Sequence, residues 1–241
     1  TPNAVSGLNA ALKDGFPVYE TWTDPFAGSS NTKSYACLKN NVFLIGDVNT
    51  HNDKSIPGNT RTSNSDFNRT AEVNLDNNIP NFVDWTQVVG GFESNNAVTY
   101  LDGNGAGISR TTSNPTGSVN AARWGMESQD TGSSGAAYYM AGMAYWAHTH
   151  DIRGANWTDS AKRRPGLRTT TYVLDVNENS AQDNANNRRN SQFFLTAKYG
   201  GFSDASGTGN PFLPSNNNAN WEKQNDPGEA KTYFLASNAA A

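Results

Sequence analysis

The sequence predicts an α/β fold, a doubly wound arrangement in which parallel strands alternate with helices. Three short segments with apolar or alternating patterns, at 42–46, 168–176 and 231–236, are typical of strands. Helical patterns precede the second strand and separate it from the third. Because this alternation implies right-handed crossovers within one sheet, we expect the three strands to be parallel neighbours.

The first two elements differ in the spacing of their apolar residues. Through 3–14 the apolar residues recur at helical spacing, and Gly15 follows as a stop signal. The run 42–45 is instead continuously apolar between Asn41 and Gly46. A run of that kind predicts a strand buried on both faces.

A long polar segment, 48–134, follows the first strand and is rich in Asn, Ser and Gly. A structureless loop of that length is unusual inside a compact domain, so we expect an insertion with some structure of its own. A start resembling a capping box at 84–87 predicts a short helix that ends at Gly90 and Gly91. Residues 97–101 are a candidate strand.

The clearest helix of the chain is predicted at 136–150. Its pattern is apolar nearly all round, which indicates burial, and its small residues would allow close approach to a sheet. A further helix is predicted at 191–199, ended by Gly200 and Gly201. The side chains that we expect to be nearly fully buried are Phe43, Ile45, Met143, Trp146, Leu174 and Phe194.

The composition favours a secreted or surface-exposed protein. Only 17% of the residues are charged, yet the mean hydropathy is -0.70, because the polarity comes from uncharged residues, 33 of them Asn. A net charge of -4 without a long basic block argues against nucleic acid as a partner. Cys37 is the one cysteine, so no internal disulfide can form.

The sequence contains no apolar stretch long enough to cross a membrane. The longest nearly apolar stretch, 136–147, is shorter than the roughly 20 residues that a bilayer requires. Both ends of the chain resemble cuts, and we therefore expect a piece of a longer protein.

Polar donors follow the strand 42–46 at every second position: Asp47, Asn49, His51 and Asp53. Ligands of open parallel sheets bind beyond the carboxyl ends of the strands. The predicted cation site therefore uses Asp47, Asn49 and Asp53, and its oxygens suit Ca²⁺ or Mg²⁺. The alternative is a turn in which Asp47 caps the loop while His51 and Asp53 tie it together by hydrogen bonds.

Two other polar groupings suggest metal binding but have simpler explanations. His148 and His150 lie two residues apart near a predicted helix end, where they do not share a face, so stabilisation of the helix dipole is favoured over zinc binding. The polar run after the strand 168–176 could bind Ca²⁺ or form a solvated loop. Its side chains are Asp175, Asn177, Asn179 and Asp183.

Several motifs, taken in chain order, resemble the PilY family of large proteins associated with type IV pili. They are WTDP at 22–25, CLKNNVFLIGDVNTH at 37–51, DK at 53–54, PGN at 57–59, MAGMAYWAHTHDIR at 140–153, TYVLDVNE at 171–178 and TYFLA at 232–236. The resemblance covers most of the chain. It implies one partial von Willebrand factor A-like domain over 1–241, with 48–134 inserted in it.

The resemblance also carries functional expectations. It implies a non-catalytic module of the bacterial cell surface that acts in pilus assembly or in adhesion at the pilus tip. Its partners would be minor pilins or other pilus-tip proteins, together with a host or surface ligand. Such A domains often hold a divalent cation with an Asp-x-Ser-x-Ser loop and an Asp that follows a later strand. Asp47 matches that later Asp by position. The Asp-x-Ser-x-Ser loop is absent upstream, and the segment 204–208 resembles it but has no buried strand before it.

Two other functions stay open from the residues alone. A metal-dependent hydrolase could use Asp47, His51 and Asp175 at the strand ends, but the chain has no Gly-x-Ser-x-Gly, P-loop or His-Glu-x-x-His motif. A structural subunit of an extracellular filament or sheath would suit the low charge and the many asparagines.

Overall fold

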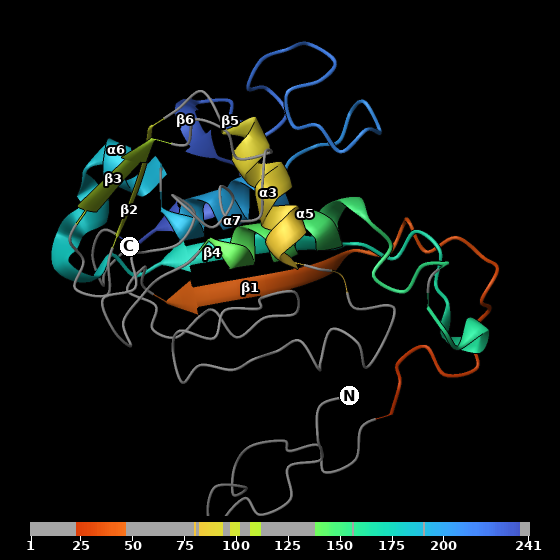
Figure 1. Ribbon diagram of the computed structural model, residues 1–241. Helices are drawn as coiled ribbons and strands as arrows, with labels where there is room; N and C mark the ends of the chain where they lie inside the picture. Colours follow the sequence, from red (N-terminus) through yellow and green to blue (C-terminus); the bar gives the residue numbers. More distant parts are fainter. Residues whose placement is uncertain are drawn as a thin grey trace, which may run out of the picture.

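The computed structural model describes residues 23–46, 80, 82–93, 97–101, 107–111, 138–155, 157–189 and 191–236. The predicted helix at 3–14 and the predicted cation ligands lie outside these ranges. Figure 1 shows the described part as a small sheet with helices packed on one side of it.

A parallel sheet of three strands is the centre of the fold. Its strands are β1 (Asn40–Gly46), β4 (Thr169–Asp175) and β7 (Tyr233–Leu235), in the order β1-β4-β7. β1 pairs with β4 along its whole length, and β7 pairs with the last three residues of β4. The mixed α/β class and the parallel order of these strands, both predicted from the sequence, are confirmed.

Two helices cover one face of this sheet: α5 (Tyr139–Thr149) and α7 (Gln192–Gly200). They approach closely because small residues stand at the contacts. A Cβ atom added at Gly200 would lie 2.8 Å from the Cβ of Thr171 and 2.9 Å from the Cβ of Ala144. The predicted helices at 136–150 and 191–199 are therefore present, and Ser191 caps α7 by accepting from the Phe194 amide.

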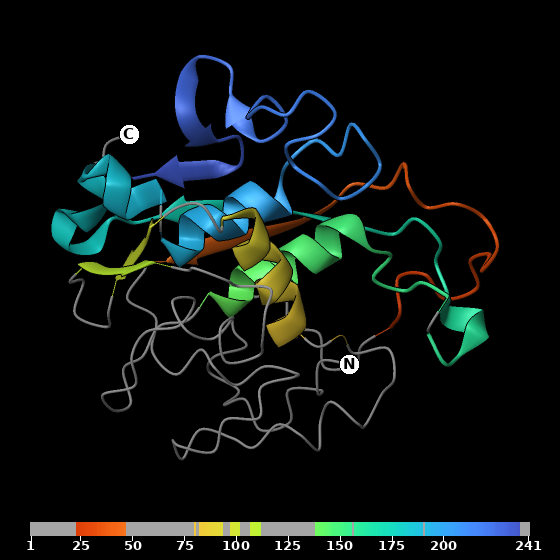
Figure 2. The same ribbon diagram turned by 45° about the horizontal axis from the view of Figure 1, so that its top comes forward.

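A third helix, α3 (Phe82–Phe92), lies across α5 in both views (Figures 1 and 2). The crossing is close, since a Cβ atom at Gly142 would lie 2.6 Å from the Thr86 amide nitrogen. The prediction that the helix ends at Gly90 and Gly91 is wrong: it continues to Phe92. Gly90 is buried, and packing of the helix against the core outweighs the low helix propensity of glycine.

The hydrophobic core lies between these three helices and the covered face of the sheet, and aromatic rings dominate it. The Tyr199 ring stacks on Phe92 with centroids 5.8 Å apart and meets Tyr145 edge-on at 6.2 Å. The buried members of the core are Val89, Tyr138, Ala141, Tyr145, Val173, Phe193, Phe194, Leu195, Ala197, Tyr199, Phe202, Trp221, Ala230 and Tyr233.

The opposite face of the sheet is exposed in the described part of the chain. Phe43 is 71% exposed, Ile45 69% and Leu174 37%, so the prediction that these three are nearly fully buried is wrong. Successive side chains of a strand point to opposite faces, and the described helices cover only one of them. Within these ranges the run 42–45 is therefore not buried on two faces: even on the side toward the helices, Leu44 is only partly buried and Val42 is 47% exposed.

Three further side chains were predicted to be nearly fully buried. Phe194 is only 2% exposed, which confirms its prediction. Trp146 is partly buried and Met143 is 37% exposed, so both of these predictions are wrong. Met143 faces the outer strand β1, where it lines a shallow apolar groove with Val42 and Leu44; Trp146 points toward a pocket described below.

Short elements complete the described fold. β2 (Ala97–Leu101) and β3 (Gly107–Thr111) form an antiparallel pair, which confirms the candidate strand at 97–101. β5 (Glu222–Lys223) pairs with β6 (Asp226–Ala230). The others are η1 (Ser160–Lys162), η2 (Glu178–Asp183) and α6 (Ala185–Arg189). No helix within the described ranges has the length and apolarity needed to cross a membrane.

Candidate functional site

The carboxyl ends of the three strands meet at one edge of the sheet, where Gly46 pairs with Asp175 and Asp175 with Leu235. The Asp175 carboxylate is fully buried there, and it accepts hydrogen bonds from the Tyr233 hydroxyl at 2.7 Å and from the Asn177 amide at 2.9 Å. Burial and the charge of Asp175 raise the pKa of Tyr233 above its usual range. Asp175 thus holds β7 and the loop after β4 in place.

The predicted cation ligands Asp47, Asn49 and Asp53, and the neighbouring His51, all lie outside the described residues. Asp47 follows Gly46, the last residue of β1, directly in the chain. The cation site therefore stays a prediction at the edge of the sheet that Asp175 also occupies.

The polar run after β4 is engaged in local hydrogen bonds. The Asn177 side-chain amide donates to Asp183 at 2.8 Å, and its oxygen accepts from the Gln182 amide at 3.2 Å. Asn177 has a left-handed backbone, as expected for a turn residue that bonds its own loop. Among the described residues, no group of three His, Cys, Asp or Glu side chains is arranged to hold a metal ion.

The segment 204–208 also closes on itself. Both Asp204 carboxylate oxygens accept from the Gly209 amide at 3.1 Å, and the Ser206 hydroxyl bonds that of Thr208 at 2.6 Å. No described strand immediately precedes it. The structure therefore gives this segment the geometry of a surface turn.

A buried ion pair joins the helix α3 to α7. Lys198 and Glu93 are 2.5 Å apart and almost fully buried, and the Tyr199 hydroxyl donates to the same Glu93 oxygen at 2.5 Å. The Lys198 ammonium also lies 4.3 Å from the ring centroid of Trp221. Burial, and after it the charge of Glu93, raises the pKa of Tyr199 well above its usual range. These contacts fix α3, and with it Trp85, against the sheet-bound helices.

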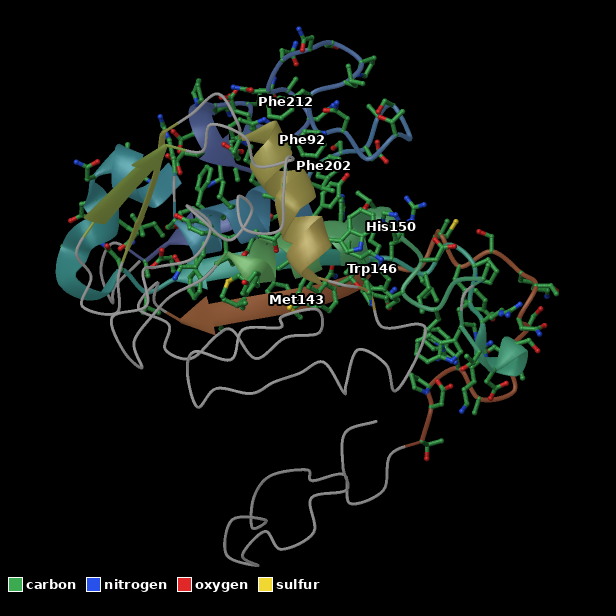
Figure 3. The ribbon with its side chains drawn as sticks, in the orientation of Figure 1. Phe92, Met143, Trp146, His150, Phe202 and Phe212 are labelled. Atoms are coloured by element: carbon green, nitrogen blue, oxygen red, sulfur yellow. The ribbon has the colours of Figure 1, made fainter. Side chains whose placement is uncertain are left out.

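A pocket of about 470 Å³ opens where the end of α5 meets α3, residues 150–155 and Trp157. We call it the tryptophan pocket, since three indoles from three separate elements line it. Figure 3 shows Trp146 and His150 side by side at this end of α5. The lining residues are Pro80, Trp85, Trp146, Thr149, His150, Asp151, Ile152, Gly154, Ala155, Trp157 and Arg168.

His150 lies between two of these indoles. Its ring centroid is 4.4 Å from that of Trp85, and it lies nearly parallel to Trp146 at 6.2 Å. Burial, and after it the positive charge of Arg168, lowers the pKa of His150. The lowered pKa favours the neutral imidazole.

The hydrogen bonds of Thr149 determine the tautomer of that neutral ring. The Thr149 hydroxyl donates its one proton to the Tyr145 carbonyl at 2.8 Å. Its oxygen lies 2.8 Å from the His150 Nδ1 atom and must accept from it. The proton of His150 is thus on Nδ1, and Nε2 is a hydrogen-bond acceptor with no partner among the described residues.

His148 is directed elsewhere, although it is only two residues away. Its Nδ1 lies 3.1 Å from the Thr169 carbonyl and its Nε2 2.6 Å from that of Phe202. Both ring nitrogens are thus taken up by backbone oxygens and are not free to bind a metal. This separation of His148 from His150 agrees with the sequence argument that the two do not share a face.

Two arginines that do not line the tryptophan pocket, Arg153 and Arg163, contact the loop that carries Trp157. Arg153 forms a bidentate pair with Asp24 at 2.9 and 3.0 Å, and its guanidinium lies 5.7 Å from the Trp157 ring centroid. The hydrogen bond from Arg153 lowers the pKa of Asp24. Arg163 donates to the Trp157 carbonyl at 2.9 Å. Trp157 is thereby fixed at the rim.

Sequence reasoning missed this pocket. It assigned Trp146 to the core and treated His150 only as a helix-terminal cation or a zinc ligand. The available signal was the motif at 145–151, where aromatic, hydroxyl, imidazole and carboxylate side chains lie within seven residues. Only the tertiary structure shows that Trp85 and Trp157, which lie outside this motif, line the same pocket.

Comparison with known proteins shows a similarity to a pilus protein. The chain is 30% identical, over 236 residues, to a type IV pilus biogenesis factor PilY1 homolog from Xylella fastidiosa (strain Temecula1 / ATCC 700964). The match covers 94% of this chain but only 16% of that protein, so the chain spans about a sixth of the relative's length. No family model matches the chain, and no solved structure gives a significant match.

Proposed function

We propose, from the relationship to the PilY family that this similarity shows, that the chain is a module of the type IV pilus system. Its role is in pilus assembly or in adhesion at the pilus tip, and it works by binding and not by catalysis. The observation that carries the proposal is the similarity over 94% of the chain to a protein named for pilus biogenesis. The proposed place of the module is the outer cell surface.

Two structural features support a binding role. The Asp175 carboxylate, buried at the sheet edge, accepts hydrogen bonds from the Tyr233 hydroxyl and from a backbone amide, as expected of a group that stabilises the fold. The exposed apolar face with Phe43 and Ile45, and the mixed aromatic and polar tryptophan pocket, are instead features of surfaces that contact other molecules. The proposed protein partners are minor pilins or other pilus-tip proteins.

The proposed fold is a partial von Willebrand factor A-like domain over 1–241 with 48–134 inserted. The parallel sheet with helices on one face is compatible with it.

We further propose that a Ca²⁺ or Mg²⁺ ion binds beside Asp47, Asn49 and Asp53. Calorimetric titration with Ca²⁺ tests the ion, comparing Asp47→Ala with the parent chain and with Asp204→Asn as a matched control. Equal Ca²⁺ affinity in all three proteins removes Asp47 from the site.

Deletion of residues 60–80 within the parent gene tests the proposed function. These residues lie in the proposed insertion, and loops on a rigid sheet can carry binding specificity without disturbing the core. We expect fewer pili or weaker attachment, measured by microscopy and by an adhesion assay against the parent strain and a strain complemented with the whole gene. Normal piliation and attachment at normal protein level, checked by blot, would contradict a role of this segment.

A further inference from the structure

The tryptophan pocket has the size and form of a small-molecule site. Its volume of about 470 Å³ lies within the range of about 300–1,000 Å³ common for ligand pockets. Of the four tryptophans in the described residues, three line this pocket and are partly accessible, whereas Trp221 is buried in the core. An indole that stays partly exposed offers an apolar face and an N–H donor to a bound molecule.

The polar groups of the pocket can bond to hydroxyl groups. His150 Nε2 is an acceptor, as its tautomer requires. Asp151 and Arg168 stand beside it with 3.3 Å between the Arg168 Nε and one Asp151 oxygen. The second Asp151 oxygen and the Arg168 terminal nitrogens have no hydrogen-bond partner among the described residues. The pocket thus offers both acceptors and donors.

The charges of the pocket discriminate between classes of ligand. A quaternary ammonium would gain from the three indoles but would face the guanidinium of Arg168. An anion would gain from Arg168 but would face the carboxylate of Asp151. A purely apolar ligand would remove water from His150, Asp151 and Arg168 without replacing their hydrogen bonds, which is unfavourable. An uncharged molecule with many hydroxyl groups avoids all three costs.

We propose that the tryptophan pocket binds an uncharged saccharide ring, with an indole against the C–H face of the sugar and its hydroxyls bonded to His150, Asp151 and Arg168. A sugar ring presents apolar C–H groups on one face and donors and acceptors around its edge, which matches this arrangement of side chains. The inference deepens the proposed adhesive function and rests on it for its biological setting, because a surface module that binds glycans would attach a pilus to a coated surface.

Titration of the 241-residue chain with soluble neutral saccharides tests the proposal. The probes are a panel of glucose, galactose, mannose and N-acetylglucosamine disaccharides, followed by tryptophan fluorescence and calorimetry. We expect saturable binding of at least one of them. Asp151→Asn, Trp157→Ala and Arg168→Gln should each weaken it by about tenfold, since a charged hydrogen-bond partner or a stacking ring is lost.

Phe43→Ala is the matched control, since it removes an exposed aromatic ring outside the pocket and should leave the affinity unchanged. Melting temperature and circular dichroism establish that each variant is folded. Arg168→Gln changes a side chain that is 48% exposed, so it reports on the site even if Trp157→Ala does not fold. Absence of saturable binding to the whole panel, equal affinity in the pocket variants, or preference for choline or acetate over every saccharide would each overturn the proposal.

The same variants separate this inference from the proposed function. Saccharide binding that is lost in Arg168→Gln, with attachment of the corresponding strain unchanged, would support the pocket and contradict its adhesive role. No saccharide binding, together with an attachment defect in the 60–80 deletion, would overturn the pocket and leave the pilus function standing.

Discussion

The two faces of the central sheet are made from the same strands and have opposite surroundings. On the covered face, Val173 has no exposed surface and Thr171 is 5% exposed under α5 and α7. On the open face, Ile45 is 69% exposed and Phe234 is 47% exposed, although both side chains are at least as apolar as the buried Val173 and Thr171. Exposure here depends on what lies above a strand and not on the hydrophobicity of its side chains.

Within the described residues, the open face forms one continuous apolar surface across the sheet. Ile45 lies opposite Leu174, and Leu174 lies opposite Phe234, so the three make a row over all three strands. Phe43 and Tyr172 stack beside this row with ring centroids 5.1 Å apart. Continuous apolar patches are uncommon on free surfaces and typical of interfaces, whereas the covered face is an ordinary core. Four predictions test this difference between the faces.

The largest effect is expected from removing an aromatic ring on the covered side. Phe194→Ala should lower the free energy of unfolding by about 3–5 kcal/mol, because it leaves a cavity among Trp221 and Tyr233. Phe43→Ala on the open face should cost much less, since its ring is mostly in solvent. Urea unfolding of both variants measures the difference, and equal losses would show that the two faces are equally packed.

A comparable loss is expected from breaking the buried ion pair in the helical layer. Lys198→Met leaves the Glu93 carboxylate buried without its partner, which should cost about 3–5 kcal/mol. The double variant Glu93→Leu/Lys198→Met removes both charges and should recover most of that loss. Lys162→Met, in an exposed pair with Asp159, is the control and should change the melting temperature little. No recovery in the double variant would argue against an uncompensated charge as the cause.

A smaller loss is expected at the crossing of α3 and α5. Gly142→Ala places a Cβ atom 2.6 Å from the Thr86 amide nitrogen and 2.9 Å from its Cα, and overpacking of this kind costs about 1–3 kcal/mol. Gly46→Ala is the matched control, because its Cβ would meet Phe193 at an ordinary 3.5 Å. Thermal unfolding of both should show a lower melting temperature for Gly142→Ala alone. A Gly142→Ala variant as stable as the parent would mean that the helices can move apart freely.

The smallest effect on stability, and the clearest on association, is expected from the open face. The double variant Phe43→Thr/Ile45→Thr removes two exposed apolar side chains that hold little of the core. We expect the melting temperature to shift by only a few degrees while solubility rises and binding of an apolar dye falls. Cooperative loss of the folded state in this variant would show that the open face is packed against something in solution.

The fold was predictable where the signal is local. The apolar runs of the three strands and the helical spacing between them lie within short segments, and backbone geometry translates these spacings directly into strands and helices. The parallel order followed because such connections have few permitted topologies. The relationship to the PilY family was likewise visible in local motifs such as 140–153, and the sequence comparison bears it out.

What depends on distant residues was not predictable. Asp47, Asn49 and Asp53 were inferred from spacing alone and stay a prediction, since they lie outside the described residues. The tryptophan pocket joins Trp85, Trp146 and Trp157, and no local pattern links positions so far apart in the chain.

By itself, the sequence determined the three strands of the central sheet and their parallel direction, the helices at 136–150 and 191–199, and the relationship to the PilY family. The tertiary structure decided which face of β1 is covered, how far α3 continues beyond Gly90 and Gly91, and which side chains meet around His150. The physical reason is that secondary structure follows from spacing along the chain. Burial and binding geometry depend instead on which separate segments the fold brings into contact.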